Sequence, residues 1–212
     1  RFDGILRQAV ARISNAFNHA RKEFGYTAPY QCIFPIKVNQ QRHVVEQLVA
    51  GGKEHGLGLE VSSKPELLAV MGLNLDPGTP MICNGYKDRE YIETALLASR
   101  LGIRPIIVVE KFSELGTILK AAKELDIKPE IGVRMKPRIQ GSGRWKESGG
   151  DRSKFGLTTR QIVEAVKVLE EAGQLDRLVL LHFHIGSQVT NVRSVKEAMR
   201  EATRTFIGLR DL

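Results

Sequence analysis

A lysine stands at the end of an apolar stretch near the start of the chain. The stretch begins at Tyr30 and ends in residues 34–40 (FPIKVNQ), where the sequence turns polar after Lys37. Burial disfavours the ammonium form and lowers the pKa of a lysine, and a neutral amine can attack an aldehyde to form a Schiff base. Lys37 is therefore a candidate nucleophile. The alternative is a lysine at a strand end whose long side chain reaches for water.

Other polar side chains also stand at or just after apolar runs that we interpret as strands. They are Glu60 and Ser62, Asn84, Arg134, and then His182, His184 and Ser187. In a barrel of parallel strands the chemistry lies at the carboxyl ends of the strands, so we expect these side chains to converge with Lys37 on one mouth. Because side chains alternate along a strand, Glu60 and Ser62 should share a face, as should His182 and His184.

The two histidines allow more than one interpretation. A His-x-His pair on a strand can bind zinc, but no further His or Cys stands at a matching strand end, and Lys37 would then have no role. We interpret His182 as a hydrogen-bonded core histidine. His184 precedes Gly186 and Ser187, where a small residue lets backbone approach a ligand and a hydroxyl can meet phosphate. An imidazole at that place could stack on a flat cofactor ring.

The elements that would position these residues alternate along the chain. An amphipathic helix is predicted over residues 5–24, and helices are predicted after each strand, with Asp88, Ser113 and Thr158 or Thr159 as caps. The predicted strands cover residues 30–38, 58–62, 80–85, 105–110, 130–135 and 178–185, and a polar, glycine-rich insert covers 136–154. This alternation favours parallel βαβ units in an incomplete (β/α)8 barrel with about six of its eight strands. An open doubly wound sheet would need a Gly-x-Gly-x-x-Gly motif after the first strand, and residues 37–40 (KVNQ) stand there instead.

Composition limits the class of protein further. At 212 residues, 42% hydrophobic and 26% charged, the chain suits one soluble globular domain. The 32 Lys and Arg are scattered among 24 Asp and Glu, which indicates a solvated mixed surface and not a nucleic-acid-binding one, although anionic small molecules remain attractive partners. Two cysteines make no disulfide framework, and no apolar run approaches a membrane span, so we expect a reduced, cytoplasmic protein. The abrupt ends of the chain predict a fragment.

Five stretches of the chain together resemble one family of cofactor enzymes. In chain order they are residues 34–40 (FPIKVNQ), 58–64 (GLEVSSK), 83–88 (CNGYKD), 153–157 (SKFGL) and 182–188 (HFHIGSQ). They resemble the biosynthetic arginine decarboxylases, which belong to the alanine-racemase-like group of pyridoxal-phosphate enzymes. The insert, with residues 141–146 (GSGRWK), favours this branch over ornithine or diaminopimelate decarboxylases.

The resemblance implies roles for individual residues. Lys37 matches the lysine that holds the cofactor through a Schiff base, His184 matches the histidine that stacks on the pyridine ring, and Ser187 resembles a phosphate ligand. Both Lys37 and His184 would be catalytic. The remaining matched positions are polar and line the same mouth: Glu60, Asn84, Arg134 and Lys154. No metal-ligand set is expected, although the resemblance allows a Mg²⁺ requirement.

The resemblance also implies a reaction and a larger protein. The α-amine of arginine would displace Lys37, the carboxylate would leave as CO2, and agmatine would be released for polyamine synthesis. Residues 1–212 would be a partial pyridoxal-phosphate-binding barrel domain, without the C-terminal β-domain, and inactive alone; the full-length protein would be a homo-oligomer. Alternatives are a decarboxylase of ornithine, lysine or diaminopimelate, a non-catalytic pyridoxal-phosphate homeostasis protein, and a metal hydrolase.

Overall fold

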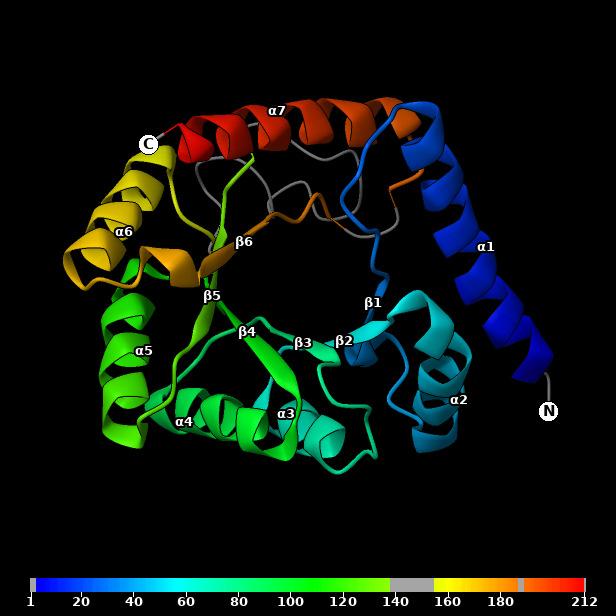
Figure 1. Ribbon diagram of the computed structural model, residues 1–212, viewed down its shortest axis with the longest axis horizontal. Coiled ribbons are helices and arrows are strands. Elements are labelled where there is room, and N and C mark those ends of the chain that lie inside the picture. The colour runs from blue at the N-terminus through cyan, green and yellow to red at the C-terminus, as the bar shows by residue number, and fades with distance from the viewer. Residues whose placement is uncertain (1–2, 138–154, 187–188, 212) are drawn as a thin grey trace. The chain divides into compact units, whose positions relative to one another are not determined.

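The computed structural model describes residues 3–137, 155–186 and 189–211. The chain forms two compact units, Arg1–Pro105 and Ile106–Leu212. In both, strands alternate with helices along the chain, as the labels in Figure 1 show. The strands are ordered β1-β2-β3 in the first unit and β4-β5-β6 in the second.

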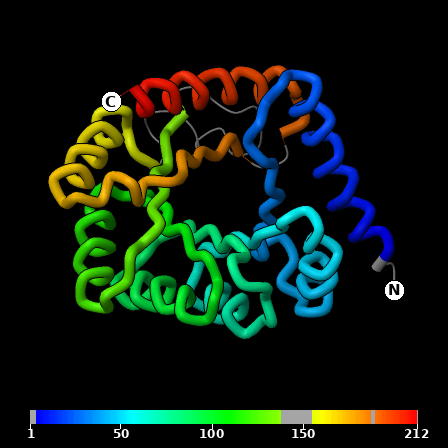
Figure 2. Tube along the Cα trace, in the orientation of Figure 1, coloured from blue at the N-terminus to red at the C-terminus, as the bar shows by residue number. Residues whose placement is uncertain are grey.

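The first unit contains three short parallel strands. Its elements are α1 (Asp3–Glu23), β1 (Ile33–Pro35), α2 (Arg42–Gly52), β2 (Gly58–Val61), α3 (Lys64–Met71), β3 (Pro80–Cys83) and α4 (Arg89–Ala98). Phe34 lies opposite Leu59 across β1 and β2, and Glu60 lies opposite Ile82 across β2 and β3. Helix α1 packs beside α2, as the blue part of the tube in Figure 2 shows.

Burial explains why the strands of this unit are so apolar. Leu59 and Val61 of β2 and Met81 and Cys83 of β3 are completely buried, as expected of parallel strands that are covered on both faces. Helix α4 begins where Asp88 accepts a hydrogen bond from the backbone N–H of Tyr91 at 2.9 Å. That contact confirms the predicted cap, and it satisfies one of the free N–H groups of the first turn.

The second unit repeats the pattern. Strand β4 (Arg104–Val109), whose first two residues belong to the first unit, is followed by α5 (Phe112–Leu125), β5 (Glu130–Arg134), α6 (Thr159–Glu171), β6 (Leu178–His182) and α7 (Val192–Arg210). Strands β4, β5 and β6 pair in parallel, with Val109 opposite Val133 and Arg134 opposite His182. Thr158 caps α6 in a reciprocal box with Gln161, which confirms the predicted start of that helix.

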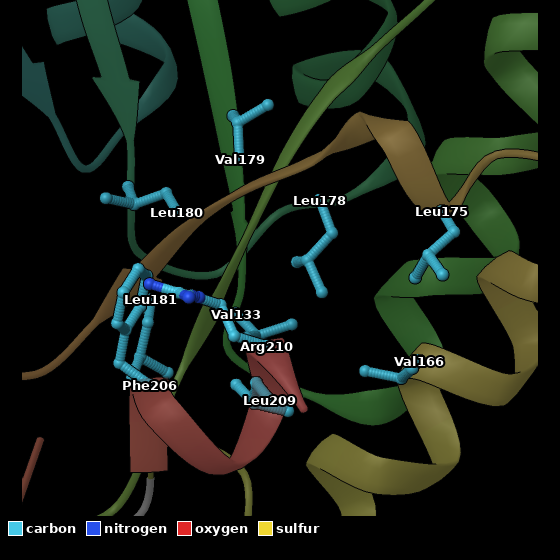
Figure 3. A pocket seen from close by; sticks show the side chains of 10 residues that line it. All are labelled: Val133, Val166, Leu175, Leu178, Val179, Leu180, Leu181, Phe206, Leu209 and Arg210. Atoms are coloured by element: carbon cyan, nitrogen blue, oxygen red, sulfur yellow. The ribbon is translucent and has the colours of Figure 1, made fainter. Parts of the chain in front are cut away.

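An apolar cavity of about 270 Å³ lies between β6, α6 and α7. Figure 3 shows the side chains that line it, among them Val166 from α6, Leu178 and Leu181 from β6, and Phe206 from α7. Strand β6 is less buried than β4 or β5, and Val179 is 43% exposed. Because the cavity is apolar and no candidate site residue lines it, we interpret it as part of the packing of the second unit.

Several predicted boundaries are wrong. The predicted strand over 30–38 is only three residues long, and Lys37 lies in the 3₁₀ helix Ile36–Val38 that follows it. Helix α5 has Lys111, not Ser113, at its N-cap. Strand β6 ends at His182, so His184 lies beyond the strand and the prediction that the two histidines share a strand face is wrong. Most of the predicted insert, residues 138–154, lies outside the described part of the chain.

Candidate active site

Lys37 forms an ion pair with Glu60, a specific contact that the sequence did not predict. Lys37 Nζ lies 3.1 Å from Glu60 Oε1, and the hydroxyl of Ser62 donates to the same oxygen at 3.0 Å. Strand β2 ends at Val61, so Ser62 lies just beyond it, but the hydrogen bond confirms that the side chains of Glu60 and Ser62 lie on the same side. The Lys37 side chain is 50% exposed and that of Glu60 only 14%, so the premise that burial deprives this lysine of water is wrong. Its amine is accessible to a ligand.

Opposing effects act on the carboxylate of Glu60. Burial raises its pKa, but hydrogen bonds from Asn84, Lys37 and Ser62 and the charge of Lys37 together outweigh burial, so the pKa lies below its usual value. Glu60 is therefore ionised at neutral pH. As a largely buried carboxylate that accepts hydrogen bonds from several donors, it holds the Lys37 side chain in one place.

The turn after β3 packs closely against the end of β2. Gly85 has a φ of +76°, and a Cβ placed on it would overlap the carbonyl oxygen of Ser62 and lie 3.0 Å from its carbonyl carbon. Only glycine fits both this backbone conformation and this approach. The buried Lys87 donates to the carbonyl oxygen of Gly85 at 2.6 Å and so ties down the same turn. The turn carries Asn84, which contacts Glu60.

Cys83 is the other candidate nucleophile in this neighbourhood by residue type. It is completely buried in β3, and burial raises the pKa of its thiol to about 12. Nucleophilic attack requires the thiolate, so this cysteine is inert at neutral pH. Lys37 remains the accessible nucleophile of the first unit's candidate site.

A second polar cluster is built around Arg134 at the end of β5. Arg134 Nη1 lies 3.0 Å from Oε2 of Glu110, the residue that follows β4, and the guanidinium lies 5.5 Å from the centroid of the Phe155 ring. The side chains of Arg134 and Glu110 are 15% and 1% exposed. Gly156, with a φ of +91°, donates its N–H to the carbonyl oxygen of Glu110 at 3.0 Å. Residues 155–157 thereby join the ends of β4 and β5.

Two glutamates that we did not predict hold the strand ends in place. Glu66 Oε2 accepts from the backbone N–H of Ser62 at 2.7 Å, and Glu114 Oε2 accepts from the backbone N–H of Glu110 at 2.8 Å. In both cases the glutamate stands four residues after the N–H that it binds, in the first turn of the next helix. A glutamate five residues after the last residue of a strand is a signal that could have identified both.

Four more residues were predicted to lie at the site: His182, His184, Lys154 and Ser187. His182 is half-buried at the end of β6, and its carbonyl oxygen accepts from the N–H of Met135 at 2.8 Å. His184 is exposed. Lys154 and Ser187 lie outside the described residues. Among residues 3–137, 155–186 and 189–211, no group of three His, Cys, Asp or Glu side chains could hold a metal ion.

No described helix combines the length and the apolar character that crossing a membrane requires.

Parallel strands that alternate with helices define the class as an α/β fold. The alanine racemase from Streptomyces coelicolor, 17% identical, shares this fold with a TM-score of 0.64 over 99% of this chain and 49% of its own. The predicted fold class is thereby confirmed.

The family is shown by sequence. A family model described as "Pyridoxal-dependent decarboxylase, pyridoxal binding domain" matches residues 10–211, and the chain belongs to this family. A biosynthetic arginine decarboxylase from Bacteroides thetaiotaomicron is 50% identical over 212 residues, which are all of this chain and 34% of that protein. The crystal structure of the biosynthetic arginine decarboxylase from Campylobacter jejuni, 37% identical, gives a TM-score of 0.88 over 100% of this chain and 34% of its own.

These findings confirm the predicted resemblance and, of the predicted cofactors, pyridoxal phosphate. The chain spans about a third of the length of these relatives. The described residues fit pyridoxal phosphate, because Lys37 offers an accessible primary amine beside an ionised carboxylate. A primary amine is the group with which an aldehyde cofactor forms a Schiff base.

Proposed function

We propose that the full-length protein containing this chain is a lyase that decarboxylates L-arginine to agmatine and CO2, with pyridoxal phosphate as cofactor. Agmatine would serve the synthesis of the polyamines putrescine and spermidine. The observation that carries the proposal is the half-exposed Lys37 amine held by Glu60 in a chain of this family. The choice of arginine is supported by relatives of about 50% identity over the whole chain that are named for that substrate.

The residues of the first cluster would bind and orient. Lys37 would hold the cofactor covalently, and Glu60 Oε1, which accepts a hydrogen bond from Lys37 Nζ at 3.1 Å, would fix the position of the amine before the cofactor binds. Ser62 and Asn84 in turn hold Glu60. When it is bound, pyridoxal phosphate supplies an electron sink for the pair of electrons that the departing carboxylate leaves behind.

The remaining roles are carried by the family resemblance. Arg134 and Lys154 are proposed as cofactor contacts, Ser187 as a phosphate ligand, and His184 as a ring that packs on the cofactor. For Arg134, the contact with Glu110 supports a fixed guanidinium. The exposed position of His184 is compatible with a side chain that covers a ligand.

The wider properties of the protein are proposals of the same kind. We propose that residues 1–212 form part of one cofactor-binding barrel domain, that the full-length protein is a cytoplasmic homo-oligomer, and that Mg²⁺ supports its activity. Size-exclusion chromatography with light scattering tests the assembly. Loss of activity on chelation, with recovery on adding Mg²⁺, tests the metal.

The alternative functions differ in what the protein does with its substrate. The purified full-length protein, loaded with pyridoxal phosphate, should release CO2 from arginine and form agmatine, and should act far more slowly on ornithine, lysine and diaminopimelate. The Lys37→Ala variant is the control and should release none. Faster decarboxylation of another amino acid would replace arginine as substrate. Cofactor binding without release of CO2 from any of the four would instead favour a homeostasis protein.

A further inference from the structure

Glu110 is a buried carboxylate at the end of β4 for which neither the sequence nor the family resemblance supplied a role. The residue is 2% exposed, and its Oε2 lies 3.0 Å from Arg134 Nη1. Replacing a buried ion pair with well-packed apolar side chains is often neutral or stabilising, so stability alone does not account for a pair at this position. What such a pair does provide is a fixed orientation of the planar guanidinium.

Arg134 is constrained from several directions. Glu110 Oε2 binds one edge of the guanidinium, and the Phe155 ring lies 5.5 Å from its central carbon. The carbonyl oxygen of Arg134 accepts from the N–H of Leu157 at 2.6 Å, which fixes the backbone from which the side chain extends. An arginine has five N–H donors, and the contact with Glu110 uses one at Nη1. The other donors belong to a side chain that is still 15% exposed.

The neighbouring Glu114 accepts hydrogen bonds from the backbone of the same turn. It is 5% exposed, and its Oε2 accepts from the backbone N–H groups of Glu110 and Lys111 at 2.8 and 3.3 Å. Glu114 thus closes the start of α5. Glu110 instead directs its carboxylate across to the next strand, 24 residues further along the chain, at a candidate cofactor residue.

We propose that Glu110 is a positioning residue for cofactor binding, which acts by holding Arg134 in the orientation that meets pyridoxal phosphate. The inference rests on the proposed function, in which Arg134 contacts the cofactor. Because the effect is one of orientation, it depends on the reach of the Glu110 side chain as well as on its charge. Glutamine keeps the reach without the charge, and aspartate keeps the charge but is shorter by one methylene group.

The experiment is a double-mutant cycle in cofactor affinity. Apoprotein of the full-length wild type, Glu110→Gln, Glu110→Asp, Arg134→Gln and the double variant E110Q/R134Q is titrated with pyridoxal phosphate, followed by visible absorbance. Arg134→Gln should weaken binding about tenfold or more, the loss expected for one hydrogen bond to a charged group. Each Glu110 variant should weaken it about fivefold to tenfold, and the double variant no more than Arg134→Gln alone.

A matched control separates positioning from loss of stability. Ile118→Val, a completely buried position on α5, removes one methylene from the same unit. It should lower the unfolding midpoint yet leave cofactor affinity within about twofold of wild type, whereas the Glu110 variants lower both.

Three outcomes would overturn the proposal. The first is that Glu110→Gln weakens binding as much in the Arg134→Gln background as in wild type. The second is that Glu110→Asp binds as tightly as wild type. The third is that Arg134→Gln has no effect while Lys37→Ala still abolishes covalent attachment, which would leave the proposed function standing. Failure of the wild type to bind pyridoxal phosphate would refute the proposed function itself.

Discussion

Replacing Gly85 with alanine tests the close packing of the turn after β3 against the end of β2. Gly78 provides a matched control, because its φ of +81° is almost the same as the +76° of Gly85 but a Cβ there would meet nothing within 4 Å. Both variants place a side chain in the left-handed region. Only the Gly85 variant also forces that side chain against the backbone of Ser62.

The two costs can be separated. A non-glycine residue in the left-handed region costs about 1–2 kcal/mol, and both variants bear this cost. At Gly85 the added Cβ would overlap the Ser62 carbonyl oxygen, and overpacking of this kind costs about a further 1–3 kcal/mol. We therefore expect Gly78→Ala to lower the free energy of unfolding by about 1–2 kcal/mol and Gly85→Ala by about 2–5 kcal/mol.

Urea denaturation of the full-length protein compares the two variants, provided that the slope with denaturant is unchanged. Pyridoxal-phosphate titration should show a further difference, because moving the turn displaces Asn84 from Glu60. Gly85→Ala should therefore bind the cofactor more weakly, and Gly78→Ala should bind it as wild type does. Equal losses of stability and equal affinities in both variants would refute the argument from close approach.

The remaining predictions concern the histidines, Glu60 and the chain by itself. His184→Ala in the full-length protein should loosen the cofactor and slow turnover, whereas His182→Ala should lower the unfolding midpoint more than it alters chemistry; the reverse pattern would exchange their roles. Because the folded state lowers the pKa of Glu60, its ionised form stabilises the fold above the ordinary value of 4.5, and this contribution is lost as pH falls through the lower folded pKa. Unfolding measured from pH 6 to pH 2 should therefore show a weaker acid dependence in Glu60→Gln, and an unchanged dependence would contradict the assignment. The 212 residues expressed alone should aggregate, bind pyridoxal phosphate weakly and form no agmatine, and agmatine above a Lys37→Ala control would disprove this.

The alternation of strands and helices could be predicted because each strand is a short, mainly apolar run between segments of helical periodicity. The length of β1 could not. Residues 30–36 are mostly apolar, but only Ile33–Pro35 pair with β2, and which residues pair depends on a strand 25 residues further along the chain. The position of Lys37 after the strand and its half-exposed side chain follow from that pairing.

In the candidate site, too, contacts that follow from local spacing could be predicted, whereas contacts between residues far apart in sequence could not. Glu60 and Ser62 could be placed together because the period of a strand is local. Glu110 could not be identified, since at the end of an apolar strand it resembles any residue that returns to solvent. Its buried carboxylate pairs with Arg134, a contact between residues far apart in sequence. The pattern that Glu66 and Glu114 share, by contrast, is local and could have been recognised.

The most direct test of the central claim is to find which lysine carries the cofactor. Borohydride reduction of the full-length protein with bound pyridoxal phosphate fixes the pyridoxyl group on the lysine that holds it, and peptide mapping then locates it. The label should be on Lys37, whose amine is half exposed, and not on Lys64, which pairs with Asp88 and Glu90, or on the buried Lys87. A pyridoxyl group on Lys64, Lys87 or Lys154 with Lys37 unlabelled would contradict the account.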